Sequence, residues 1–201
     1  MKIIKETFQR AVILVIIMTV LCGFIYPLTI TAISQVFFNN KANGSIIKAD
    51  GKKYGSELLG QQFTGDKYMW GRIMNINTQT FTDASGSTLL YASPSNISTT
   101  SEEFAKLVNE RVDKIKGANP DADADQIPVD LVTSSGSGLD PQISYTAANY
   151  QIERIAKSRG ISASQVQNII DQYTTNRFVG VFGEKVVNVL KVNLALDGIL
   201  D

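Results

Sequence analysis

The chain has 201 residues with 19 basic and 19 acidic side chains, one cysteine and no histidine. The missing histidine excludes a Ser-His-Asp triad, a Cys-His pair and any histidine-ligated metal. Beyond the N-terminal region the net charge is slightly negative, so no basic field is present that would attract nucleic acid.

Residues 11–40 form an uninterrupted stretch without a charged side chain. A helix rises about 1.5 Å per residue, so about 20 apolar residues cross a hydrocarbon core of roughly 30 Å. The apolar run Ala11–Phe38 exceeds that length. The sequence therefore predicts one transmembrane helix over residues 11–38.

The charges at the N-terminus predict the orientation of this helix. Residues 1–10 carry three basic side chains and one acidic one, and such tails tend to stay in the cytoplasm. We therefore expect a cytoplasmic tail over residues 1–10 and a soluble extracytoplasmic domain over residues 39–201. A cleaved signal peptide would have a shorter apolar region, and bulky Leu21 disfavours lipid attachment at Cys22.

Three residues of the predicted helix are candidates for contact with another membrane helix. Thr19 and Gly23 form a small-xxx-small face that allows close packing, although this spacing is also common by chance. Pro27 lacks a backbone donor, so we expect a bend where it frees the carbonyl of Gly23.

The polar part of the chain shows signals for both helices and strands, which predicts an α+β fold with one mixed α/β domain. Asp50-Gly51, flanked by residues 46–49 and 52–54, predicts a hairpin, and the apolar runs 178–182 and 186–196 predict closing strands. Three helices are expected from their capping residues. The first covers 104–117, with Thr100 and Glu103 as its capping box, and the second runs from Ser144 to Arg159-Gly160. The third begins at Ser162, with Gln165 completing its capping box.

A turn-rich segment over residues 133–141, here called the Ser/Gly loop, is the main candidate for anion binding. Its central residues Ser135, Gly136, Ser137 and Gly138 could direct several backbone N–H groups at a phosphate. The alternative is a tight loop that needs glycine for its backbone angles. No metal site is expected, because the acidic run 121–125 is followed by Gln126 where a calcium loop needs glycine.

A second candidate is the aromatic strip, residues 68–72, which contains Tyr68, Trp70 and Arg72. An aromatic pair beside an arginine could recognise a partner through stacking or cation–π contact. The alternative is that both rings anchor the core while Arg72 pairs with an acidic side chain.

Several blocks of the sequence carry a resemblance to a known family. They comprise the single N-terminal span, Gly60-Gln61 with Phe63, the strip 68–72, Ser85–Ser87, Pro94-Ser95-Asn96, Pro128–Ser144, Ala147-Ala148, Gln151, Arg154, Arg159-Gly160, Gly180–Glu184, Val187–Leu190 and Asn193–Asp197. In this order they resemble the C subunit of the Kdp potassium-transporting ATPase over nearly the whole chain. Two departures are Gln142, where the family often has histidine, and Ile73, where it often has proline.

The resemblance implies a non-catalytic accessory subunit in the cell membrane. Its implied partners are a P-type ATPase subunit, a channel-like potassium-binding subunit and a small single-span peptide. Members of the family are described as catalytic chaperones that raise the ATP affinity of the ATPase subunit. The chain lacks the phosphorylated Asp-Lys-Thr-Gly motif of P-type pumps, so it cannot form the aspartyl phosphate itself. We expect no tightly bound cofactor, and ATP only through the complex.

The resemblance also suggests site residues. The nucleotide candidates are Ser135, Gly136, Ser137, Gly138 and Gln142, and the partner-contact candidates are Thr19, Gly23, Pro27, Tyr68, Trp70, Arg72 and Asp140. A domain outside the membrane cannot meet cytoplasmic ATP, so we expect an indirect effect on ATP affinity through linkage. The alternatives are direct nucleotide binding by the Ser/Gly loop and a membrane-anchored extracytoplasmic enzyme acting on wall or nucleotide substrates.

Overall fold

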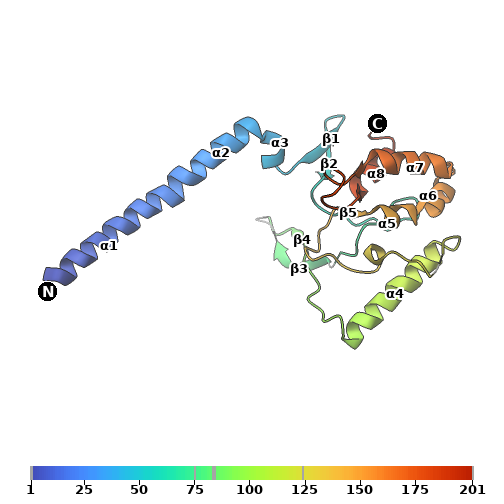
Figure 1. Cartoon of the computed structure of the whole chain (residues 1–201), viewed down its shortest axis with the longest axis horizontal. Helices are drawn as coiled ribbons and strands as arrows, with labels where there is room; N and C mark the ends of the chain where they lie inside the picture. The colour runs from blue at the N-terminus through green and yellow to red at the C-terminus, as the bar shows by residue number, and fades with distance from the viewer. Residues whose placement is uncertain (1, 75, 83–84, 124, 201) are drawn as a thin grey trace. The chain divides into compact units, whose positions relative to one another are not determined.

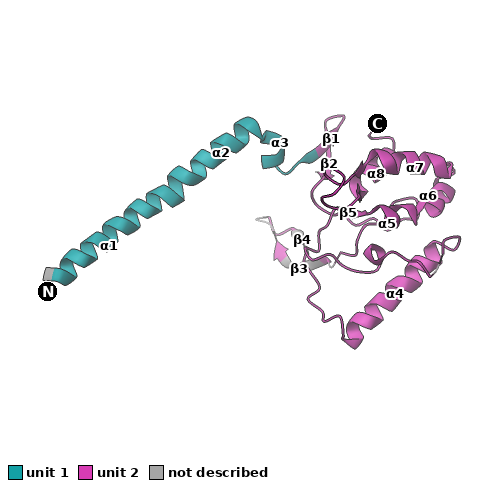
Figure 2. Cartoon of the chain, viewed as in Figure 1, with its two compact units in different colours: residues 1–46 teal, residues 47–201 magenta. Residues whose placement is uncertain are grey.

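The structure, a computed structural model, describes residues 2–74, 76–82, 85–123 and 125–200. Two compact units make up the chain, residues 1–46 and residues 47–201 (Figure 2). The first holds a long apolar helix and the second mixes helices with small antiparallel sheets (Figure 1). The α+β expectation with one N-terminal apolar helix is confirmed.

The first unit is built around a helical rod. Helix α1 (Lys2–Val20) continues through a π-helical turn, η1 (Leu21–Ile25), into α2 (Tyr26–Phe37), and the short α3 (Asn39–Ala42) follows. Within the described residues, the stretch Ile3–Phe37 alone is long and apolar enough to cross a membrane. Its large apolar side chains are exposed, as a surface in contact with lipid requires.

The predicted bend at Pro27 is replaced by a wider helical turn. The N–H of Tyr26 donates to the carbonyl of Leu21, five residues earlier, immediately before the proline. The wider turn of this i→i+5 pattern accommodates the ring of Pro27 and the hydrogen bond that Pro27 cannot donate. The rod in Figure 1 accordingly continues without a sharp kink.

Two hairpins stand in the first half of the second unit. Strands β1 (Ile46–Ala49) and β2 (Lys52–Ser56) are joined by Asp50 and Gly51, with φ of 50° and 74°. Two positive φ angles in a two-residue loop are typical of a type I′ turn, so the predicted hairpin is confirmed. Strands β3 (Ile76–Thr82) and β4 (Thr88–Ala92) form a second antiparallel hairpin, which the sequence analysis did not identify.

The core of the second unit lies between a three-stranded antiparallel sheet and the C-terminal helices. The sheet has the order β5 (Gln142–Ser144), β7 (Val186–Asn188), β6 (Thr174–Thr175), and Ile143 pairs with Val187. The helices are α4 (Glu102–Ala118), α5 (Tyr145–Asn149), α6 (Ile152–Arg159), α7 (Ala163–Gln172) and α8 (Val189–Leu196), with the short 3-10 turn η2 (Val129–Leu131). The buried cluster that joins them includes Met69, Leu131, Ile143, Ile155, Val166, Ile170, Val187 and Val192.

Two of the three predicted helix starts are confirmed and one is displaced. Ser144 accepts from the N–H of Ala147, and Ser162 with Gln165 forms a complete capping box. The N-cap of helix α4 lies one residue later than predicted, because Ser101 rather than Thr100 accepts from the N–H of Phe104 at 3.1 Å. Its C-terminal cap is Asn119, so the helix continues past Gly117.

The prediction of two closing strands is wrong in most of its length. Residues 178–182 form an exposed tight turn, and the strand within 186–196 ends at Asn188. The side chain of Asn188 accepts from the N–H of Lys191 at 3.0 Å and begins helix α8. A short apolar run alone does not distinguish a strand from a buried helix. The N-terminal cap at Asn188 favours the helix here.

Candidate functional site

The centre of the aromatic strip is held by two buried amide side chains. Asn193 accepts from the N–H of Met69 at 2.7 Å and donates to its carbonyl at 2.9 Å. Gln151 does the same for Trp70, accepting at 2.8 Å and donating at 3.1 Å. The two amides form the hydrogen bonds that a neighbouring strand would otherwise provide. They thereby satisfy backbone groups that are buried away from water.

The ring of Trp70 is buried and anchors the core. It is 7% exposed, and its indole N–H donates to the carbonyl of Gly65 at 2.9 Å. The guanidinium carbon of Arg154 lies 4.2 Å from the ring centroid, and the Lys114 amine lies 5.1 Å from it. Trp70 therefore does not present a free face, which corresponds to the core-anchor alternative.

Arg154 joins the aromatic strip to helix α4. Its Nε donates to Asn119 at 3.1 Å and one terminal nitrogen donates to Gln151 at 2.6 Å. Desolvation by burial lowers the pKa of Arg154 to about 10, and the nearby charge of Asp66 opposes this shift. Arg154 therefore remains cationic at neutral pH, with its donors used inside the domain.

Tyr68 occupies the half-buried N-terminal end of the strip. Its hydroxyl donates to Asp197 at 3.1 Å, and its ring lies 5.5 Å from that of Phe63. The guanidinium of Arg159 is 5.2 Å from the Tyr68 ring and also bonds Asp197 at 2.8 Å. These contacts tie the strip to the C-terminal end of α8.

Arg72 connects the aromatic strip to the Ser/Gly loop. One terminal nitrogen donates to the hydroxyl of Thr133 at 3.3 Å and to the carbonyl of Ser134 at 3.1 Å. The other lies 3.7 Å from the carboxylate of Asp140. Arg72 and Asp140, both partner-contact candidates, are thus brought together as a clamp across the two ends of the loop.

The serine hydroxyls of the loop are used within the loop. Ser135 Oγ accepts from the N–H of Gly138 at 2.9 Å, and Ser137 Oγ accepts from the N–H of Leu139 at 3.2 Å. The carbonyl of Leu139 in turn accepts from the N–H of Gly60 at 2.7 Å. These bonds favour a tight structural turn over an open phosphate cradle.

Gly138 allows the loop to approach another segment closely. Its φ is +72°, and a Cβ built there would lie 2.5 Å from the carbonyl carbon of Ser93. Any side chain would therefore collide with the backbone before Pro94. The predicted need for glycine at this position is a consequence of both backbone angle and packing.

The nucleotide candidates do not share one surface. Gly136 and Ser137 form the exposed tip of the loop, whereas Ser135 and Gly138 are buried. Gln142 lies in β5 and lines a separate cavity of about 300 Å³ together with Gln172, Asn188 and the Glu57–Lys191 ion pair, among other residues. No residue from 135–138 lines that cavity.

Two further cavities flank the aromatic strip. One, of about 350 Å³, lies between helix α6 and the C-terminal end of helix α4. Tyr150 lines it, and burial raises the pKa of the Tyr150 phenol. The other, of about 70 Å³, is lined by Trp70, Arg72, Arg111 and Lys114, among others. Among the described residues, no three His, Cys, Asp or Glu side chains gather where they could hold a metal ion.

Gln151, Asn193 and Arg154 organise this region, although no sequence motif predicts a role for them. Their partners lie 81, 124 and 35 residues away in the chain. No local pattern reveals such pairs. All three stand within the blocks that carried the family resemblance, and this was the only signal available for them.

Comparison with known proteins gives the same family over nearly the whole chain. A family model described as "K+-transporting ATPase, c chain" matches residues 8–198. A protein of Clostridium perfringens named "Potassium-transporting ATPase KdpC subunit" is 62% identical over 200 residues, covering 100% of this chain and 99% of the relative. A protein of the same name from Paraburkholderia phytofirmans is 44% identical, covering 96% and 97%. One from Clostridioides difficile is 43% identical, covering 97% and 98%.

Proposed function

The chain belongs to the family of K+-transporting ATPase c chains, and from this premise we propose that it is a non-catalytic accessory subunit that acts outside the membrane. In this proposal residues 1–10 lie in the cytoplasm and the polar domain lies on the outer side. The domain covers the entrance of the potassium-binding subunit, and the membrane helix, with Thr19 and Gly23 on one face, holds the complex together. Assembly involves a P-type ATPase subunit, the channel-like subunit and a small single-span peptide.

The internal use of the Ser/Gly loop is the observation that carries the proposal. Two of the loop's serine hydroxyls and the adjacent Arg72 are occupied by bonds within the domain. A loop in this state offers few free groups to a triphosphate. This favours an indirect effect on ATP, in which the subunit binds one state of the complex better than another. Affinity for ATP then rises by linkage, with no cofactor held by this chain.

The location of the domain is tested by labelling a cysteine at the exposed loop tip. Ser137→Cys in a Cys22→Ser background is treated on intact cells with a membrane-impermeant maleimide. We expect prompt labelling, because Ser137 is exposed and the domain lies outside. Labelling only after the membrane is opened would place the loop in the cytoplasm and favour direct nucleotide binding.

The role of the domain is tested by a truncation that keeps only the span. A chain ending at residue 46 retains the first compact unit and should insert into the membrane. We expect potassium uptake at low external potassium to fall at least tenfold, and the KM for ATP of the assembled complex to rise several-fold. Normal uptake with normal KM would refute the proposed role of the domain.

A further inference from the structure

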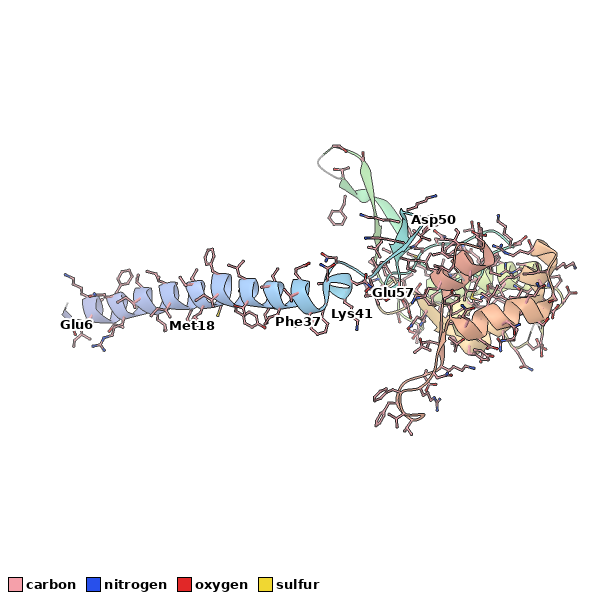
Figure 3. The ribbon with its side chains drawn as sticks, turned by 90° about the horizontal axis from the view of Figure 1, so that it is seen from above. Glu6, Met18, Phe37, Lys41, Asp50 and Glu57 are labelled. Carbon is pink, nitrogen blue, oxygen red and sulfur yellow. The ribbon has the colours of Figure 1, made fainter. Side chains whose placement is uncertain are left out.

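The segment between β6 and β7 presents an unusual group of exposed apolar side chains. We call residues 177–184 the apolar hairpin. Phe178, Val179, Val181 and Phe182 lie on it consecutively around Gly180, and each is between 68% and 75% exposed. Figure 3 shows this segment standing out from the body of the second unit. Contiguous apolar groups of this kind on a soluble domain mark sites of interaction.

The hairpin is held in one shape by its own bonds. The N–H of Phe178 donates to the carbonyl of Phe182 at 2.8 Å, and the N–H of Phe182 donates back at 3.0 Å. Below this pair, Arg177 and Glu184 form an ion pair at 2.6 Å. The four apolar side chains are therefore presented by a closed turn, and little ordering is needed when they are buried.

One backbone angle in the turn is unfavourable for the residue that adopts it. Val179 has a φ of +53°, a left-handed conformation that a β-branched side chain rarely takes. Glycine or asparagine would relieve this strain. Strain of this kind is concentrated at sites where a residue is required for contact. A valine there is therefore consistent with a role for its side chain in binding.

The charges that flank the apolar hairpin indicate what kind of surface it binds. Arg177 is neutralised by Glu184, and the next basic residue, Lys185, has its amine 3.3 Å from the centroid of the Tyr145 ring. Segments that bind a lipid surface typically carry free basic side chains, with tryptophan or tyrosine at the interface. This hairpin has neither, and its fixed shape suits a preformed protein groove.

We propose that the apolar hairpin docks the second unit into an uncharged, apolar groove on another subunit of the same transporter. The inference rests on the proposed function, because that function supplies the other subunits. Phe178 and Phe182 are the anchors, since aromatic side chains buried at the centre of an interface dominate its affinity. Val179 and Val181 complete the inserted surface.

The binding partner of the apolar hairpin is identified by photo-cross-linking, with the full-length chain in the assembled transporter. A benzophenone amino acid replaces Val181 in one variant and Val129 in the matched control, a valine 64% exposed outside the hairpin. We expect irradiation to give a covalent product with another transporter subunit from position 181, at least tenfold above position 129. Products only with lipid, or only with a second copy of this chain, would overturn the proposal.

A pair of substituted chains tests whether the contact contributes to assembly. In Val179→Asn/Val181→Asn the backbone strain is relieved, so folding should be preserved and a single cooperative urea transition checks this. We expect the amount retained on the detergent-solubilised transporter to fall at least tenfold, with Val129→Asn retained normally. Normal retention would refute the docking role. If the span-only truncation still abolished uptake in that case, the proposed function would stand and only the hairpin assignment would fail.

Discussion

Single polar residues determine the shape of the Ser/Gly loop and its surroundings. Arg72 holds both ends of the loop, and the amide of Gln151 fixes both Trp70 and Arg154. Removing one member of such a network leaves its buried partners without hydrogen bonds, at about 1–3 kcal/mol each. The Ser/Gly loop is therefore tied to the rest of the domain by these bonds, except at its exposed tip, Gly136 and Ser137.

Two glycines of the same loop should respond very differently to alanine. Gly138→Ala forces a left-handed angle on alanine and brings its Cβ into the Ser93 carbonyl, so we expect a loss of about 3 kcal/mol in unfolding free energy. Gly136→Ala meets open space and should change stability by less than about 0.5 kcal/mol. Urea unfolding of the full-length chain in detergent, followed by fluorescence of its only tryptophan, Trp70, measures both. Equal effects would contradict the close packing at Gly138.

Elements with a strong local signal could be predicted from the sequence. Asp50-Gly51 determines its hairpin through two positive φ angles, and the capping box of Ser162 begins α7. Strand β3 was missed because Ile76–Thr82 contains two apolar residues, Ile76 and Phe81, too few for an alternating apolar pattern. The candidate site was harder, since its arrangement depends on partners up to 124 residues apart, such as Asn193 with Met69.

Helix α4 provides a test of the capping assignment at the level of one element. Ser101→Ala removes the acceptor for the N–H of Phe104, so we expect a loss of about 1 kcal/mol. Thr100→Ala, one residue earlier, should cost less than about 0.5 kcal/mol, because the Thr100 hydroxyl bonds Ser98 outside the helix. The same urea titration compares the two variants. A larger effect at Thr100 would restore the capping box predicted from the sequence.

The whole molecule combines one helix long and apolar enough to cross a membrane with a polar domain that carries no histidine. Because histidine is the side chain that normally changes charge between pH 5 and 8, the domain lacks the usual sensor of neutral pH. The buried Arg154, with its pKa lowered to about 10, keeps its charge throughout this range. Its protonation is linked to folding only above about pH 10, where stability from this group would rise with pH.

We therefore expect the unfolding free energy of the full-length chain to change by less than about 0.5 kcal/mol between pH 6 and 8. The positive control is Tyr150→His, which places an imidazole in the half-buried setting that raises the pKa of the Tyr150 phenol. Partial burial disfavours the charged imidazolium and is a larger effect at this position than the nearby charge of Asp123, which favours it, so its folded pKa should lie below the unfolded value of about 6.5. The unfolded state then binds more protons, and stability should rise with pH from about 5.5 to 7.5 in the variant alone. A similar slope in the natural chain would mean that another group titrates in the domain near neutral pH.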